Sequence, residues 1–146
     1  MSDRLIILGN GATAERLAEL GRWLRYDEVQ VRSDGASDIS ASDHVVIAED
    51  SPGPGRALLR LLVAGVAPAY LGYAAPRSEG SGAWIALVRG AVPADRLDEI
   101  AAPAGVDVGA ESPEEVAIAI AAELVAVRHG RPRPSAGLPL PGGADA

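Results

Sequence analysis

Short apolar runs typical of buried strands alternate along this chain with runs that have helical spacing. The strand-like runs are Leu5–Leu8, Val29–Val31, Val45–Ala48, Ala69–Leu71 and Val106–Val108, the clearest helical runs are Ala12–Leu24, Gly55–Val63 and Ser112–His129, and Ala83–Val88 and Asp95–Ala101 continue the alternation. Strands that alternate with helices form a parallel sheet, because each connection must cross back over the sheet. The pattern predicts an α/β fold, a Rossmann-like three-layer domain with a mainly parallel sheet of about five strands.

The last helical run has well-defined ends. Ser112 is a good N-cap, Pro113 suits the first helical position, and Glu115 stands three residues after the cap, which completes a capping box. Gly130 is a typical helix stop. Upstream, the glycines that flank Val106–Val108 indicate a short buried strand that approaches a backbone or a ligand closely.

A glycine-rich turn follows the first predicted strand and opens the first predicted helix. Residues 9–14 read Gly-Asn-Gly-Ala-Thr-Ala, which fits the dinucleotide-binding pattern G-x-G-x-x-G/A. In that pattern Gly9 permits the turn and Gly11 lets a pyrophosphate approach the backbone, with Asn10, Ala12 and Thr13 beside it. The alternative is that these small residues only make a tight turn between strand and helix.

Further candidate ligand-binding residues follow the second, fourth and fifth predicted strands. A site for NAD places an acidic residue about 20 residues after the glycine turn, and here Ser33 and Asp34 stand near that position. Arg32 with Ser33 is compatible with a 2′-phosphate, as in NADP, or with a pterin dinucleotide; alternatively, Asp34 simply begins a polar loop. Gly72, Arg77 and Asp107 complete the candidate set, with Arg77 as a phosphate partner and Asp107 facing the cleft or holding a turn.

Composition excludes several classes of function. A net charge of −7 argues against a nucleic acid or an anionic membrane as partner. The 146 residues include no cysteine and no lysine, so they offer no thiolate nucleophile, persulfide carrier or Schiff base. The two histidines, His44 and His129, are not at metal-ligand spacing and are expected to be solvated or capping residues.

The chain is expected to form one domain over residues 1–130, followed by a disordered tail over residues 131–146 that is rich in proline and glycine. The first apolar run is too short for a signal peptide or a membrane span, so a cytoplasmic location is expected. Trp23 and Trp84 are expected to be half-buried, and Glu123 is expected on a solvated helix face or at a partner interface.

Residues 102–130 read APAGVDVGAESPEEVAIAIAAELVAVRHG. This segment resembles the C-terminal Rossmann-like domain of the xanthine dehydrogenase accessory protein family (XdhC/CoxI), and a weaker likeness extends over Leu5–Gly130. The other, N-terminal domain of that family has no counterpart here, so the resemblance implies a stand-alone Rossmann module.

The resemblance implies an accessory or maturation factor for a molybdenum hydroxylase of the xanthine dehydrogenase or CO dehydrogenase type. Such a factor handles molybdenum cofactor (molybdopterin) and helps its sulfuration and insertion. The implied partners are an apo molybdenum hydroxylase or a full-length family relative. We expect the partner to bind at the exposed faces near Glu111–Glu123. A cysteine-free chain would leave the sulfur to a separate cysteine desulfurase or to the relative. Apolar helical faces also predict a homodimer.

Several positions depart from the family pattern in one direction. Alanine occupies positions where relatives carry polar residues, at Ala12, Ala48 and Ala101, while Arg77 is kept. These departures favour a non-catalytic binding protein with no catalytic residue. Two alternatives remain open: an NAD(P)-dependent oxidoreductase that uses Gly9, Gly11 and Ala14, and a regulatory interaction module without a ligand.

Overall fold

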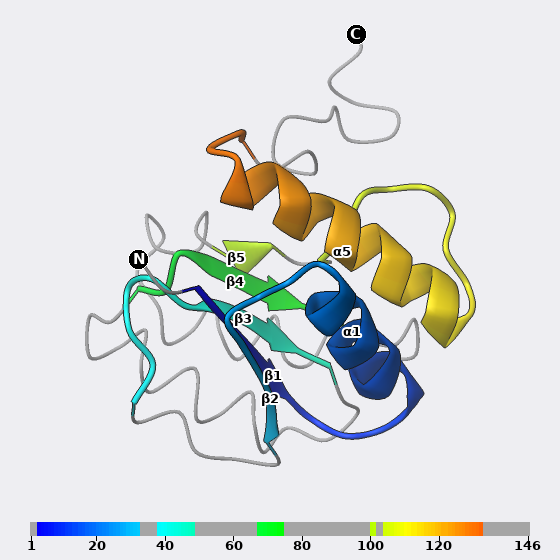
Figure 1. Cartoon of the computed structure of the whole chain (residues 1–146). Coiled ribbons are helices and arrows are strands. Elements are labelled where there is room, and N and C mark those ends of the chain that lie inside the picture. Colours follow the sequence, from blue (N-terminus) through cyan, green and yellow to red (C-terminus); the bar gives the residue numbers. More distant parts are fainter. Residues whose placement is uncertain (1–2, 33–37, 49–66, 75–99, 102–103, 133–146) are drawn as a thin grey trace, which may run out of the picture.

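A computed structural model describes residues 3–32, 38–48, 67–74, 100–101 and 104–132 of the chain (Figure 1). The described strands are β1 (Arg4–Leu8), β2 (Glu28–Arg32), β3 (His44–Ile47), β4 (Tyr70–Tyr73) and β5 (Ile100–Ala101). They form one sheet in the order β2-β1-β3-β4-β5, and every neighbouring pair is parallel. The predicted α/β fold with a five-stranded parallel sheet is therefore confirmed.

Two helices, α1 (Ala12–Trp23) and α5 (Pro113–Arg128), lie side by side over one face of the sheet (Figure 1). Between helices and sheet, Leu5 and Ile7 of β1 join Leu17 of α1 and Ile120 and Leu124 of α5 in one core cluster, all fully buried. The residues of β1 and β3 that face the other way are buried as well. Burial on both faces explains why these strands read as unbroken apolar runs.

The predicted ends of α5 are confirmed. The Ser112 hydroxyl accepts a hydrogen bond from the backbone N–H of Glu115, and the Glu115 carboxylate accepts one from the backbone N–H of Ser112, both at 3.1 Å. Pro113 opens the helix, and Gly130 has a positive φ of 70° just after the last turn. Since the cap satisfies otherwise orphaned N–H groups, the start of α5 is fixed locally.

The end of α1 uses an arginine where a glycine is usual. Arg25 adopts the left-handed conformation with φ of 62°, its N–H donates to the Arg22 carbonyl, and the N–H of Tyr26 donates to the Gly21 carbonyl. This is the pattern of a Schellman motif. It turns the chain sharply toward β2 and places Tyr26 under the sheet's amino-terminal edge.

Arg128, at the end of α5, holds the chain around Tyr26 in place. The Arg128 guanidinium lies 4.3 Å from the centre of the Tyr26 ring, donates to the Leu24 carbonyl at 2.8 Å and pairs with Asp3 at 2.9 Å. On the other side, the Tyr26 hydroxyl lies 2.9 Å from Nδ1 of His44, and both side chains are buried. A cation–π contact, an ion pair and a buried hydrogen bond thus join α1, α5, β1 and β3.

One predicted strand is wrong. Val106–Val108 lies in the loop before α5, with Val108 exposed, and the fifth strand is Ile100–Ala101, at the end of the Asp95–Ala101 run. Gly105 and Gly109 have φ values of +103° and +74°, which break an extended conformation at both ends of the segment. The predicted close approach is real, because a Cβ at Gly105 would lie 3.2 Å from Ala119 of α5.

Three side chains differ from expectation. Trp23 is 79% exposed, because it follows the buried Gly21 by two residues and therefore points to the opposite side of the helix. His44 is buried inside the sheet, and Glu123 is fully buried against Tyr70. Helical periodicity shows on which side of α5 Glu123 lies, but it does not show that a buried tyrosine is there. The Tyr70 hydroxyl donates a hydrogen bond to the Glu123 carboxylate, so this carboxylate can be buried. His129 is the exposed C-cap of α5, as expected of a capping residue.

The expected helix Gly55–Val63, the run Ala83–Val88 with Trp84, and the tail from residue 133 onward lie outside the described residues. The domain boundary at residue 130 stays a prediction. In the described segments, no helix combines the length and the apolar character needed to cross a membrane.

The buried His44 imidazole makes the stability of the fold dependent on pH. Burial lowers the pKa of His44 below its ordinary value of 6.5, and Arg128 acts in the same direction. The carboxylates of Asp3 and Asp43 oppose this shift but do not cancel it. The folded state therefore favours neutral His44.

We expect the free energy of unfolding to fall as pH drops below 6.5, because the unfolded chain then binds a proton that the buried His44 does not. The slope is at most about 1.4 kcal/mol per pH unit. Urea unfolding between about pH 5 and about pH 7.5 measures it. His44→Gln should flatten the slope and the exposed-site control His129→Gln should keep it; equal slopes in the two variants would contradict the assignment.

Candidate functional site

The predicted phosphate-binding turn lies at the carboxyl-terminal edge of the sheet, between β1 and α1. Gly9 and Gly11 both have positive φ, at 146° and 115°, and the Gly9 N–H donates to the Arg32 carbonyl at 2.8 Å. Asn10, Gly11 and Ala12 are exposed and Thr13 is half-buried. The turn therefore needs glycine for its backbone conformation and presents its outer side to solvent.

The amino-terminal end of α1 is open. Gly11 is its N-cap and supplies no side-chain hydrogen bond, whereas α5 has a full capping box. A Cβ at Gly11 would meet no atom within 4 Å among those described, so a ligand has room there. First-turn N–H groups and the positive end of the helix dipole favour an anion such as phosphate.

The first turns of α1 and α5 meet at this edge. Arg16 of α1 pairs with Glu114 of α5 at 3.3 Å and with Glu19 at 2.9 Å. The loop over residues 104–112 enters α5 here and carries the exposed Asp107 (Figure 1). The loop that contains Asp107 therefore starts beside the end of β4 and enters α5 at the edge of the sheet that carries Gly9–Thr13.

A buried carboxylate holds the start of that loop. Oε1 of Glu123 accepts hydrogen bonds from the Tyr70 hydroxyl at 2.5 Å and from the backbone N–H of Gly105 at 3.1 Å. The N–H groups of Ala104 and Val106 donate to carbonyls of β4 and α5. Glu123 therefore positions the start of this loop, although the sequence pattern alone predicts that its side chain is exposed to solvent.

Gly72 lies inside β4 and is buried. A Cβ on Gly72 would lie 2.6 Å from the Tyr70 hydroxyl and 2.9 Å from Cβ of Ala104. Close packing of the Tyr70 side chain and the loop therefore accounts for this glycine. Contact between Gly72 and a ligand stays a prediction.

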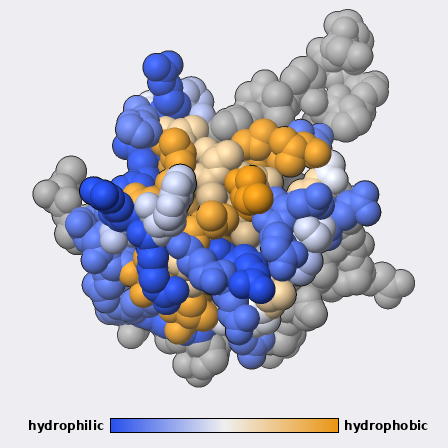
Figure 2. Space-filling view, turned by 45° about the vertical axis from the view of Figure 1, so that its right-hand side comes forward, coloured by the Kyte–Doolittle hydropathy of each residue, from blue (hydrophilic) through white to orange (hydrophobic). Residues whose placement is uncertain are grey.

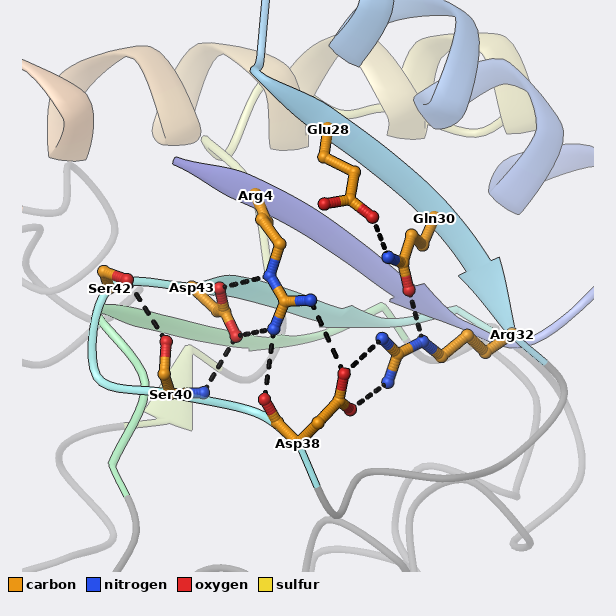
Figure 3. Close-up of polar contacts among 8 residues, drawn as sticks. All are labelled: Arg4, Glu28, Gln30, Arg32, Asp38, Ser40, Ser42 and Asp43. Carbon is orange, nitrogen blue, oxygen red and sulfur yellow. Dashed lines mark hydrogen bonds and ion pairs between the residues drawn. The ribbon is translucent and has the colours of Figure 1, made fainter. Parts of the chain in front are cut away.

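Arg32, at the end of β2, is engaged within the protein. Its guanidinium makes two hydrogen bonds to Asp38, at 2.7 and 3.0 Å, and one to Gln30 (Figure 3). These bonds from Arg32 hold the pKa of Asp38 at about 2. A 2′-phosphate would have to compete with this carboxylate. Ser33, Asp34 and Arg77 lie outside the described residues, so their roles stay predictions.

The clearest charge pair lies at the opposite, amino-terminal edge. Arg4 donates to both carboxylate oxygens of Asp43, at 2.9 and 2.7 Å, and contacts Asp38 as well (Figure 3). Burial raises the pKa of Asp43, but hydrogen bonds from Arg4 and from the backbone N–H of Ser40 outweigh it and leave the pKa below its ordinary value. The hydrogen bond to Asp43 raises the pKa of Arg4.

Arg4 and Asp43, whose pKa values are shifted, lie at the opposite end of the strands from the Gly9–Thr13 turn. Arg4 begins β1, whereas Gly9 follows the end of β1. Parallel α/β sheets bind ligands at the carboxyl-terminal edge. The Arg4–Asp43 pair therefore stabilises the fold, and it does not face the candidate site. In the part of the chain that the structure describes, no group of three or more His, Cys, Asp or Glu side chains is arranged to hold a metal ion.

The outer surface of the helical layer has an apolar band. Figure 2 shows apolar surface in the middle of the face that α1 and α5 form, with hydrophilic margins. Two large side chains are exposed on these helices, Trp23 at 79% and Ile118 at 59%. Large exposed apolar side chains such as these are typical of protein-binding surfaces.

Comparisons with known proteins give both a fold and a family. A crystal structure described as a xanthine dehydrogenase from Bacillus halodurans superposes with a TM-score of 0.70 at 21% sequence identity. The match covers 94% of this chain and 45% of that chain, so the present chain spans less than half of the solved protein. No curated protein matches the sequence. The model of the XdhC Rossmann domain matches residues 5–124. The chain therefore belongs to the XdhC Rossmann domain family.

Proposed function

We propose that this chain is an accessory factor in the maturation of a molybdenum hydroxylase of the xanthine dehydrogenase or CO dehydrogenase type. It binds molybdenum cofactor or a nucleotide, the client enzyme, or both. Membership of the XdhC Rossmann domain family supports a role related to xanthine dehydrogenase. The observation that carries the ligand-binding part is the turn Gly9–Thr13, which exposes Asn10, Gly11 and Ala12 at the start of α1.

The residues present fit the phosphate end of such a ligand. Molybdopterin and nucleotides both carry phosphate, and the turn offers backbone N–H groups with room above Gly11. Asp107, in the loop that enters α5 at the same edge, is a candidate acceptor for ring or ribose N–H and O–H donors. When bound, molybdopterin would supply the ligand that holds molybdenum, because no cluster of described side chains does so.

The chain's own residues favour binding of a ligand over catalysis. It has no cysteine to carry a persulfide and no lysine to act as a base. Arg4, Asp43 and His44 have clearly shifted pKa values and stand at the amino-terminal ends of strands. At the candidate edge, hydrogen bonds with Glu19 and Glu114 raise the pKa of Arg16, and the cap hydrogen bonds lower the pKa of Glu115, so both shifts come from contacts that hold the helices. We infer that sulfur for the cofactor comes from a separate cysteine desulfurase or from a full-length relative.

A second candidate is an NAD(P)-dependent oxidoreductase, which the glycine pattern of the turn favours. The ion pair between Arg32 and Asp38 makes NAD the better fit of the two nicotinamide cofactors, because a 2′-phosphate would meet a carboxylate already bound to that arginine. Reduction or oxidation of bound nicotinamide, followed by absorbance, would distinguish this activity from simple binding.

Ala12→Glu tests the phosphate-binding turn. A carboxylate in the first turn of α1 complements the helix dipole, so the melting temperature should stay equal or rise slightly. The same charge repels an anionic ligand, and affinity should fall by about tenfold. The readout is a thermal-shift panel with NAD, NADP and molybdopterin.

The matched control is Ala122→Glu, which adds the same charge at an exposed alanine in α5. It should keep the ligand-induced shift. Gly11→Leu should also abolish the shift, but with a loss of stability of about 1–3 kcal/mol, because φ of 115° strains any L residue. Equal ligand shifts in Ala12→Glu and wild type would reject the site, and no shift with any ligand would favour the ligand-free regulatory function.

The client interaction is tested in the host. Deletion of the gene should lower the molybdenum content or the sulfido-dependent activity of its molybdenum hydroxylases, and expression of the wild-type chain should restore both. Ile118→Arg should fail to restore them, because it charges the apolar band near Glu111–Glu123 without disturbing the core. His129→Arg, which adds a charge at the exposed end of α5, is the control. Normal metal content and activity after deletion would contradict the proposal.

A further inference from the structure

Strand β2 ends the sheet on one side, and its sequence is complementary to itself. In the described sheet β2 pairs only with β1. Its five residues are Glu28, Val29, Gln30, Val31 and Arg32. Read in reverse, the pattern is the same with the two charges exchanged. An antiparallel pair of such strands centred on Gln30 places each glutamate opposite an arginine.

The backbone of β2 is in the right phase for this pairing. The Arg32 carbonyl accepts the Gly9 N–H, so Arg32 directs its backbone polar groups toward the β1 side. Because these groups alternate along a strand, Gln30 and Glu28 also face β1. Val29 and Val31 therefore direct their N–H and C=O groups toward the open edge of the sheet.

We propose that a second copy of this chain pairs with β2, antiparallel, around a two-fold axis at Gln30. Val29 then forms two hydrogen bonds with Val31 of the partner subunit, and the symmetry repeats them, which gives four backbone hydrogen bonds. Glu28 lies opposite Arg32 of the partner subunit in a position without backbone hydrogen bonds. Side chains approach most closely at such positions, so two cross-strand ion pairs form, in which Glu28 shares the Arg32 guanidinium with Asp38.

The side chains of β2 are already arranged for this contact. Glu28, Gln30 and Arg32 lie along one face and are joined in a row, with Gln30 hydrogen-bonded to both neighbours (Figure 3). On the other face Val29 packs on the core beside Gly21, while Val31 is 44% exposed. Pairing sets Val31 against Val29 of the partner subunit and covers this exposed valine.

Charge complementarity identifies the occupant as a second copy. Charged side chains on an edge strand normally discourage pairing with another strand. Here Glu28 and Arg32 stand two residues on either side of Gln30. In a two-fold pair of β2 strands each glutamate therefore faces an arginine, so the charges attract. The two sheets run in opposite directions in this dimer. The two Gly9–Thr13 turns therefore lie at opposite ends, and both stay open to ligand.

Val31→Pro tests the pairing, because proline removes an N–H that the fold of one subunit does not use. The full 146-residue chain should be a dimer at micromolar concentration by sedimentation equilibrium. The variant should raise the dimer dissociation constant about tenfold or more, since two hydrogen bonds are lost by symmetry. Val31→Thr keeps the N–H and the branched shape, so it is the matched control and should remain dimeric.

Glu28→Arg gives an independent test that does not touch the backbone. It places like charges opposite each other across the axis, so the dimer should weaken, and more at low than at high salt. Glu15→Arg, the same change on the exposed face of α1, should have no such effect. A monomer at all concentrations would overturn the proposal. So would a dimer that Glu28→Arg leaves intact, which would point to another surface such as the apolar band on α1 and α5.

Discussion

The central strand β1 is buried on both faces, and this constraint shapes the rest of the molecule. Residues 5–8 have no exposed surface, so no polar side chain is tolerated along the middle of the strand. In the two central strands β1 and β3, polar side chains therefore stand only where the strand begins, as at Arg4 and His44. The two edges of the sheet have therefore become chemically different.

At the amino-terminal edge, side chains neutralise one another. Arg4 is bound by Asp43, Arg128 by Asp3, and the His44 ring by the Tyr26 hydroxyl. At the carboxyl-terminal edge, α1 begins without a side-chain cap hydrogen bond among the described residues, and its first-turn backbone N–H groups stand there instead. A phosphate bound there, as proposed, would complete hydrogen bonding without a charged side chain from the protein, which suits a chain of net charge −7.

Local signals predicted the sheet and the two described helices well, because each depends on residues close in sequence. The capping box at Ser112 and the glycine turn at Gly9 needed only short-range spacing. The failures needed tertiary information. Val106–Val108 has strand-like composition, yet its flanking glycines take positive φ, and Glu123 looks solvated until Tyr70 is placed beneath α5. The exposure of Trp23 could have been found from helical phase, since Gly21 faces the sheet.

In the segment that resembles the accessory family most closely, several residues have a clear structural role. Gly105 lets the loop pass against Ala119, Ser112 caps α5, and Glu123 fixes the loop through its backbone N–H. These tasks position Asp107 without involving it, since it stays exposed between two glycines. The likeness in this segment therefore reports how the loop is held at the carboxyl-terminal edge of the sheet, and under the proposed function the specificity for a ligand comes from the residues that the loop and the Gly9–Thr13 turn present to solvent.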